Sequence, residues 1–179
     1  GVNFFLVFAN VLWMPIFLGF ADEATIGLVM TGIGLAMVAG SVGMSAWGGP
    51  ERLVPAIVAL LVAAGLLLSV SGLRPSLLVA GGAVMAFLFL IPFVNGLCQT
   101  LWQRMVEASI LGRVFSTRRM IASIASPLAD VAAGPLADGV FEPLLAPDGS
   151  LSGSLGSFVG VGAGRGSALL VVFAGIGVV

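Results

Sequence analysis

The sequence predicts an all-α polytopic membrane protein with five complete transmembrane helices and a truncated sixth. Apolar residues make up 59% of the 179 residues, whereas soluble domains contain about 45–50%. They gather in runs of about 20 residues, the length that an α-helix needs to cross a bilayer. The runs do not alternate every second residue, as the strands of a membrane barrel would.

Short polar or glycine-rich segments separate the runs. Asp22 and Glu23 close the first, Gly-Gly-Pro-Glu-Arg closes the second, and Arg74 and Pro75 follow the third. Because these connections are short, consecutive helices are expected to be antiparallel neighbours. The last run is too short to span a bilayer, and both chain ends lie inside apolar runs, so we expect a piece of a longer protein. The predicted helices cover residues 2–20, 25–47, 53–70, 77–98, 117–141 and 167–179.

The segment between the fourth and fifth runs has an amphipathic pattern. We predict an interfacial helix over residues 99–112, with Trp102 as its membrane anchor. The alternative is a cytoplasmic extension of the fourth helix. One face would carry Leu101, Trp102, Met105, Val106 and Ile110, and the other Gln103, Arg104 and Glu107.

The arginines predict the orientation in the membrane. Alternate connections fall on opposite sides, and five of the seven arginines lie on the side that holds residues 47–52 and 99–119. The positive-inside rule makes this side cytoplasmic. The segment 142–166, rich in Gly and Ser, is then external and expected to be flexible. The predicted location is the cell membrane, crossed several times.

Several classes of function are excluded by residues that the chain lacks. It has no His and a single cysteine, Cys98. The usual metal sites therefore lack their His and Cys ligands. A Ser-His-Asp triad lacks its histidine base. No basic stripe suits nucleic acid. We expect neither an enzyme nor a cofactor, metal or nucleic-acid partner.

Two carboxylates lie inside the fifth run, Asp130 near its middle and Asp138 near its external end. A carboxylate at bilayer depth costs roughly 2.5 kcal/mol or more and is a functional-site hypothesis by default. Together with Ser126 and Gly134 they recur every four residues and form one small, polar face. Asp130 would bind a proton or a cationic substrate, or else pair with a buried polar group. Asp138 either shares this pathway or is simply solvated.

Two amides are further candidates for the pathway. Asn10 lies near the middle of the first run, and Asn95 at the inner end of the fourth. Either they contact a transported molecule, or they form the hydrogen bonds that hold membrane helices together. An apolar substrate pocket could be lined by some of the aromatic residues Trp13, Phe17, Phe87, Phe89 and Phe93.

Small residues recur every four positions in the second run, at Gly32, Ala36 and Gly40. Such rows let the backbones of membrane helices approach closely. The row serves either static packing or a contact that slides during a conformational change.

Several short motifs follow one another in a recognisable order. They are Gly48-Gly49-Pro50-Glu51-Arg52, then Gln99-x-x-x-Gln103, Leu111-Gly112-Arg113-Val114-Phe115-Ser116, and Gly134-Pro135-Leu136-Ala137-Asp138. In this order the chain resembles the carboxyl-terminal half of a major facilitator superfamily transporter. The most similar group is the macrolide-efflux and enterobactin-exporter-like branch. The resemblance covers nearly the whole sequence.

The resemblance implies a twelve-helix protein of two six-helix halves with alternating access to a central site. It implies proton-coupled efflux of small amphipathic molecules that are drug, macrolide or siderophore-like. The partners would be the lipid bilayer, the small-molecule substrate and the missing amino-terminal half. Candidates for a cytoplasmic gating loop are Gly40, Gly49, Glu51, Arg52 and Arg113. The alternative is a non-transporting membrane domain that anchors or partners a larger protein.

Overall fold

The structure is a computed structural model and describes residues 12–13, 22–73, 76–107, 109–146 and 165–178. No strand occurs in these ranges, so the all-α prediction is confirmed for them. The helical elements are α2 (Glu23–Trp47), α3 (Leu53–Leu73), α4 (Leu77–Met105), α5 (Leu111–Leu136), a π-helical turn η1 (Ala137–Phe141), α6 (Glu142–Leu144) and α8 (Arg165–Val178).

Three of these helices are long and apolar enough to cross a membrane, over Ala24–Trp47, Leu53–Gly72 and Leu78–Met105. Their outer faces carry large apolar side chains; Leu28, Leu35 and Val38 of α2 are 73%, 66% and 62% exposed. A continuous apolar stripe of this kind suits contact with lipid. Except for residues 12–13, the predicted span 2–20 lies outside the described residues. The count of five complete spans stays a prediction.

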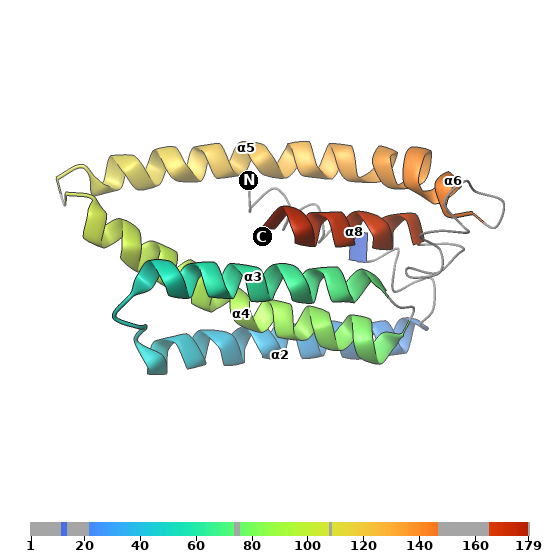
Figure 1. The fold of residues 1–179 in the computed structure, drawn as a ribbon, viewed down its shortest axis with the longest axis horizontal. Helices are drawn as coiled ribbons and strands as arrows, with labels where there is room; N and C mark the ends of the chain where they lie inside the picture. The colour runs from blue at the N-terminus through green and yellow to red at the C-terminus, as the bar shows by residue number, and fades with distance from the viewer. Residues whose placement is uncertain (1–11, 14–21, 74–75, 108, 147–164, 179) are drawn as a thin grey trace.

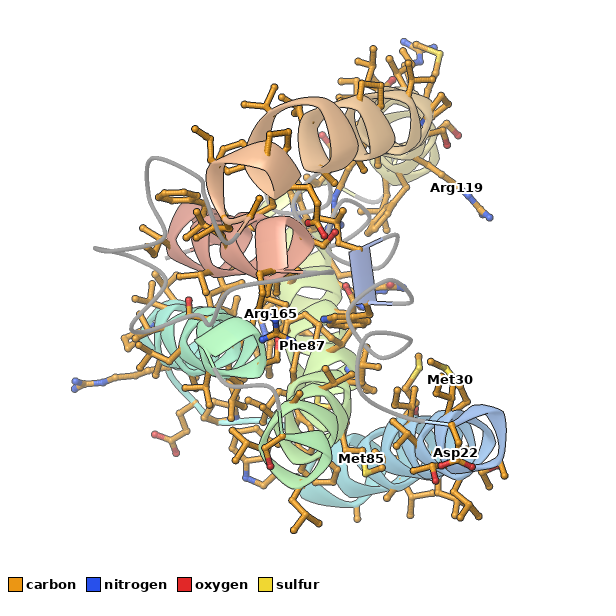
Figure 2. All side chains as sticks on the ribbon, turned by 90° about the vertical axis from the view of Figure 1, so that its right-hand side faces the viewer. Asp22, Met30, Met85, Phe87, Arg119 and Arg165 are labelled. Atoms are coloured by element: carbon orange, nitrogen blue, oxygen red, sulfur yellow. The ribbon has the colours of Figure 1, made fainter. Side chains whose placement is uncertain are left out.

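The described helices follow an arc when viewed along their length (Figure 2). Helix α2 packs on α4, α4 on α3, and α3 on α8, while α5 joins α8 through η1. The arc therefore runs from α2 through α4, α3 and α8 to α5, and residues 12–13 lie on its inner side. The α2–α3 and α4–α5 connections lie together at one end of the molecule (Figure 1). We call this the arginine-rich end, because Arg52, Arg104 and Arg113 lie beside these connections.

Glycines allow the closest helix contacts. A Cβ atom at Gly40 of α2 would overlap the backbone carbonyl of Phe89 in α4. A Cβ atom at Gly175 of α8 would overlap the backbone of α3 at Gly65 and Ser69. The predicted close approach at the small-residue row of α2 is thus confirmed at Gly40, and α3 and α8 use the same device.

Local residues fix both ends of α2. The Asp22 carboxylate accepts hydrogen bonds from the N–H and hydroxyl groups of Thr25, and these bonds hold the pKa of Asp22 below its usual range. At the other end, Gly48 and Gly49 have φ angles of +72° and +91°. Glycine adopts this left-handed backbone without steric cost, so the chain can turn sharply into α3.

The separate interfacial helix predicted over residues 99–112 is not formed. Instead α4 continues to Met105, as in the alternative of an extended fourth helix, and Val106 ends it with an extended backbone. No Gly or Pro lies between Cys98 and Met105, and the Gln and Arg residues there favour helix. Helix α5 also begins earlier than predicted, at Leu111 rather than at residue 117. Its early arginines are compatible with helix although they raise its polarity.

Candidate functional site

A polar cavity of about 470 Å³ lies between the last turns of α4 and the first turns of α5. It belongs to the arginine-rich end, where α4 connects to α5 (Figure 1). We call it the polar cleft. Gln99 of α4 lines it together with Phe115, Ser116, Arg118, Arg119 and Ala122 of α5.

Arg118 joins the two helices across this cleft. Its guanidinium carbon lies 5.7 Å from the centre of the Trp102 ring, which is a cation–π contact. The neighbouring Arg119 extends toward the side of the arc on which residues 12–13 lie (Figure 2). The Ser116 hydroxyl donates to the Gly112 carbonyl at 2.9 Å, so its proton is already used. The hydrogen-bond donors that remain for a ligand are the two arginines and the Gln99 amide.

The polar cleft opens on the face of α5 that also carries Asp130. At 3.6 residues per turn, Phe115, Arg119, Ala122, Ser126, Asp130, Ala133 and Ala137 share one face of the helix. Ala133 and Ala137 are 0% and 3% exposed, so the carboxyl-terminal part of this face packs on the rest of the protein. The position of Asp130 in the helix is described, while its side chain lies outside the described part.

The predicted pathway residue Asn95 belongs to α4. Asn95 lies one turn before Gln99 on α4, on the same face of that helix, and is exposed. Asn95 does not line the polar cleft, and α4 diverges from α5 toward the middle of the molecule (Figure 1).

A second cavity, of about 450 Å³, lies at the same end of α5. Arg118 lines both cavities, but the second is mostly apolar. The predicted gating residue Arg113 lines the second cavity and not the polar cleft. The lining of the second cavity consists of Trp102, Arg113, Val114, Thr117, Arg118 and Ile121.

The opposite end of α5 contains the second predicted carboxylate. Asp138 falls in η1, which follows Pro135 and contacts α8. π-helical turns are rare and are frequent at functional sites. As for Asp130, the side chain of Asp138 lies outside the described part.

Two charged residues meet just beyond η1. The Glu142 carboxylate accepts the Gly166 N–H at 2.9 Å. Arg165 is only 4% exposed; burial lowers the pKa of its guanidinium group, and the negative charge of Glu142 opposes this shift. The predicted flexible segment 142–166 thus begins with the helical turn α6, and its two ends are held together. Residues 147–164 of this segment lie outside the described residues.

The remaining predicted site residues are spread over the fold. Gly40 is buried against α4, whereas Gly49, Glu51 and Arg52 form the turn between α2 and α3 at the arginine-rich end. Asn10 lies outside the described residues.

Among the predicted pocket aromatics, Trp13 and Phe87 are buried and meet edge to face, with ring centres 5.8 Å apart. The buried indole N–H of Trp13 has no hydrogen-bond partner in the described part of the chain. Phe89 and Phe93 of α4 are also neighbours, at 5.4 Å, and Trp47 of α2 lies 5.9 Å from Phe93. The described ranges contain no group of three His, Cys, Asp or Glu residues placed to hold a metal ion.

Sequence reasoning missed the polar cleft and the burial of Arg165. It used Arg118 and Arg119 only for orientation and assigned Trp102 to the membrane interface. The available signal was the spacing of Phe115, Arg119 and Ala122, which places them on the same face of the helix as Asp130. Nothing in the local sequence distinguishes Arg165 from a solvated loop residue. Comparison with protein-family models, curated proteins and solved structures finds no match to this chain.

Proposed function

We propose that this chain forms one half of a secondary active transporter that exports small amphipathic molecules in exchange for protons. The motif order described above supports membership of the major facilitator superfamily. Three helices that can cross a membrane and an arc of helices are compatible with half of such a transporter. The side of the arc on which residues 12–13 lie would face the other half across the substrate pathway.

The observation that carries the proposal is the polar character of one face of α5 near its middle. Arg119 of the polar cleft, Ser126 and Asp130 share this face, and Asp138 follows in the π-helical turn. A helix that only anchored the protein in lipid would have no need of polar residues along its inner face, since each of them is costly at bilayer depth. A transporter needs them, because substrate and protons pass between its helices.

In the proposed mechanism Asp130 carries the proton. Its carboxyl group would hold a proton while it is away from water, because burial disfavours the charged form. When the pathway opens to the side of lower proton concentration, the proton leaves and the carboxylate can attract a cationic or polar substrate. Rocking of the two halves about the midplane alternates the access between the two sides.

The test is proton-driven transport by the full-length protein in proteoliposomes, with ethidium and erythromycin as probes. We expect Asp130→Asn to lower the initial rate at least tenfold, because the amide cannot exchange a proton. Membrane insertion and the yield of folded protein should not change. Glu107→Gln is the matched control, since it removes one carboxylate that is exposed in the α4–α5 connection; its rate should equal that of the wild type.

Two results would reject the mechanism or the function. Equal rates in the wild type and Asp130→Asn would remove Asp130 from the coupling step. If neither probe moves in response to a proton gradient and a soluble partner protein copurifies stoichiometrically, the membrane-anchor alternative replaces the transporter.

A further inference from the structure

We infer that the polar cleft between α4 and α5 is a binding site for a phosphate group. This goes beyond transport, because the cleft would bind phosphate whether or not a substrate moves through the protein. The volume of about 470 Å³ falls within the 300–1,000 Å³ that is usual for small-molecule sites.

The charged side chains that line the cleft are both positive. Arg118 and Arg119 both line it, and in the described part of the chain neither forms an ion pair with a carboxylate. Arginine has a planar fork of N–H donors that matches phosphate oxygens, and it keeps its charge at any physiological pH. Two such groups on successive residues attract one phosphate more strongly than either would alone.

The contact with Trp102 leaves these donors available. The Arg118 guanidinium lies over the aromatic face, so the ring does not occupy the N–H groups in the guanidinium plane. Because the contact restricts the side chain, less conformational entropy is lost when a phosphate binds. Gln99 adds amide N–H donors from the facing helix, and Arg119 lines the same cleft from α5.

The position in the fold suits a phosphate ligand. The cleft lies at the arginine-rich end, which the positive-inside rule assigns to the cytoplasm. Basic pockets between membrane helices on this side bind the head groups of anionic phospholipids. A soluble phosphate from the cytoplasm would meet the same donors, so the two sources must be separated by experiment.

The experiment measures binding to the purified full-length protein in nanodiscs. In nanodiscs of phosphatidylcholine, sodium phosphate is titrated against sodium chloride at matched ionic strength, and the thermal unfolding midpoint is followed. In parallel, phosphatidylglycerol replaces part of the phosphatidylcholine, and native mass spectrometry counts the lipids retained. A midpoint raised by phosphate but not by chloride identifies a soluble phosphate. Retention of phosphatidylglycerol alone identifies a phospholipid head group.

The variants connect this binding with the cleft. We expect Arg119→Gln to weaken the binding about tenfold or more, the usual effect of losing a charge-assisted hydrogen bond. Arg113→Gln is the matched control: it removes an arginine from the same end of α5 that does not line the polar cleft. Arg119→Lys keeps the charge and should lose less affinity than Arg119→Gln.

The inference is overturned if the wild type binds neither ligand in preference to chloride and phosphatidylcholine. It is also overturned if Arg113→Gln weakens the binding as much as Arg119→Gln, because the effect would then come from general charge. If Arg119→Gln does not fold, the comparison of phosphate with chloride on the wild type and the Arg119→Lys titration decide the question.

Discussion

The group formed by α2, α3, α4 and α8 and the single helix α5 are packed in different ways. Within the group, neighbouring helices touch through glycines, as at Gly40 and Gly175, and their backbones are in direct contact. Helix α5 joins the group mainly through η1 at its carboxyl-terminal end, and through Arg118 near its other end. Between these points it presents large exposed side chains, at Ile121, Ile124, Leu128 and Val131.

The difference shows where the fold is rigid and where it can respond to a ligand. Backbone contacts through glycine allow little movement without loss of packing. A helix that is held at two points and faces a polar cleft can change its distance from its neighbour with the loss of few contacts. This less tightly held helix carries the residues proposed to bind a ligand or a proton, Arg118, Arg119 and Asp130.

Removal of a core side chain from the group should have the largest effect. Phe87 of α4 is 2% exposed and packs on Trp13. We expect Phe87→Ala to lower the free energy of unfolding by about 3 kcal/mol, because the cavity cannot close in a tightly packed interior. The measurement is the unfolding equilibrium in mixed micelles. Ile124→Ala in α5 is the comparison. It should change the free energy of unfolding by less than about 0.5 kcal/mol, as is usual for exposed positions. Equal losses would show that α5 is packed as tightly as the group.

Addition of a methyl group at a glycine contact between helices should have the next largest effect on stability. We expect Gly40→Ala to destabilise the protein by about 2 kcal/mol, the usual cost of overpacking, because the new methyl group meets the rigid backbone at Phe89. Gly34→Ala, on the same helix, is the control: no atom lies within 4 Å of its added Cβ. It should be neutral or slightly stabilising through helix propensity. A destabilised Gly34→Ala would mean that loss of glycine itself, rather than the contact, is responsible.

Loss of the contact that holds the amino-terminal end of α5 should have the smallest effect on stability. Trp102→Ala removes the cation–π contact with Arg118, worth about 0.5–1 kcal/mol at exposed sites. Backbone amides of residues 111–122 should exchange with deuterium up to about fivefold faster, the factor that corresponds to 1 kcal/mol. Exchange within α3 should not change. Trp102→Phe keeps an aromatic face and should give an intermediate rate. Faster exchange throughout the protein would contradict a local role for Trp102.

The sequence was sufficient to predict the helices of the tightly packed group. Their apolar runs are uninterrupted, and clear polar breaks such as Gly48-Gly49-Pro50 separate α2 from α3. The small-residue row predicted the approach of α2 to another helix, because glycine spacing is a local pattern. The predicted boundaries failed around residues 99–117, where polarity was taken as the end of a helix. Polar residues with high helix propensity extend a helix out of the apolar region instead.

The candidate site was less predictable, for a physical reason. The face that carries Asp130 follows from periodicity, since it depends on one helix only. The polar cleft depends on two helices and on the stacking of Arg118 over Trp102, which are 16 positions apart. The pairing of Glu142 with residues at the start of α8 is likewise a long-range contact. A single sequence contains no signal for such pairs.

The π-helical turn η1 has a geometric consequence for α5. A π-helical turn holds about one residue more than an α-helical turn. If Ala137–Phe141 took α-helical geometry, the extra residue would have to be absorbed elsewhere, and α5 would turn about its own axis by roughly 100° relative to α6. That rotation would turn the row from Phe115 to Ala133 by the same angle about the axis of α5. Five residues at one end of α5 thus set the direction in which its polar side points.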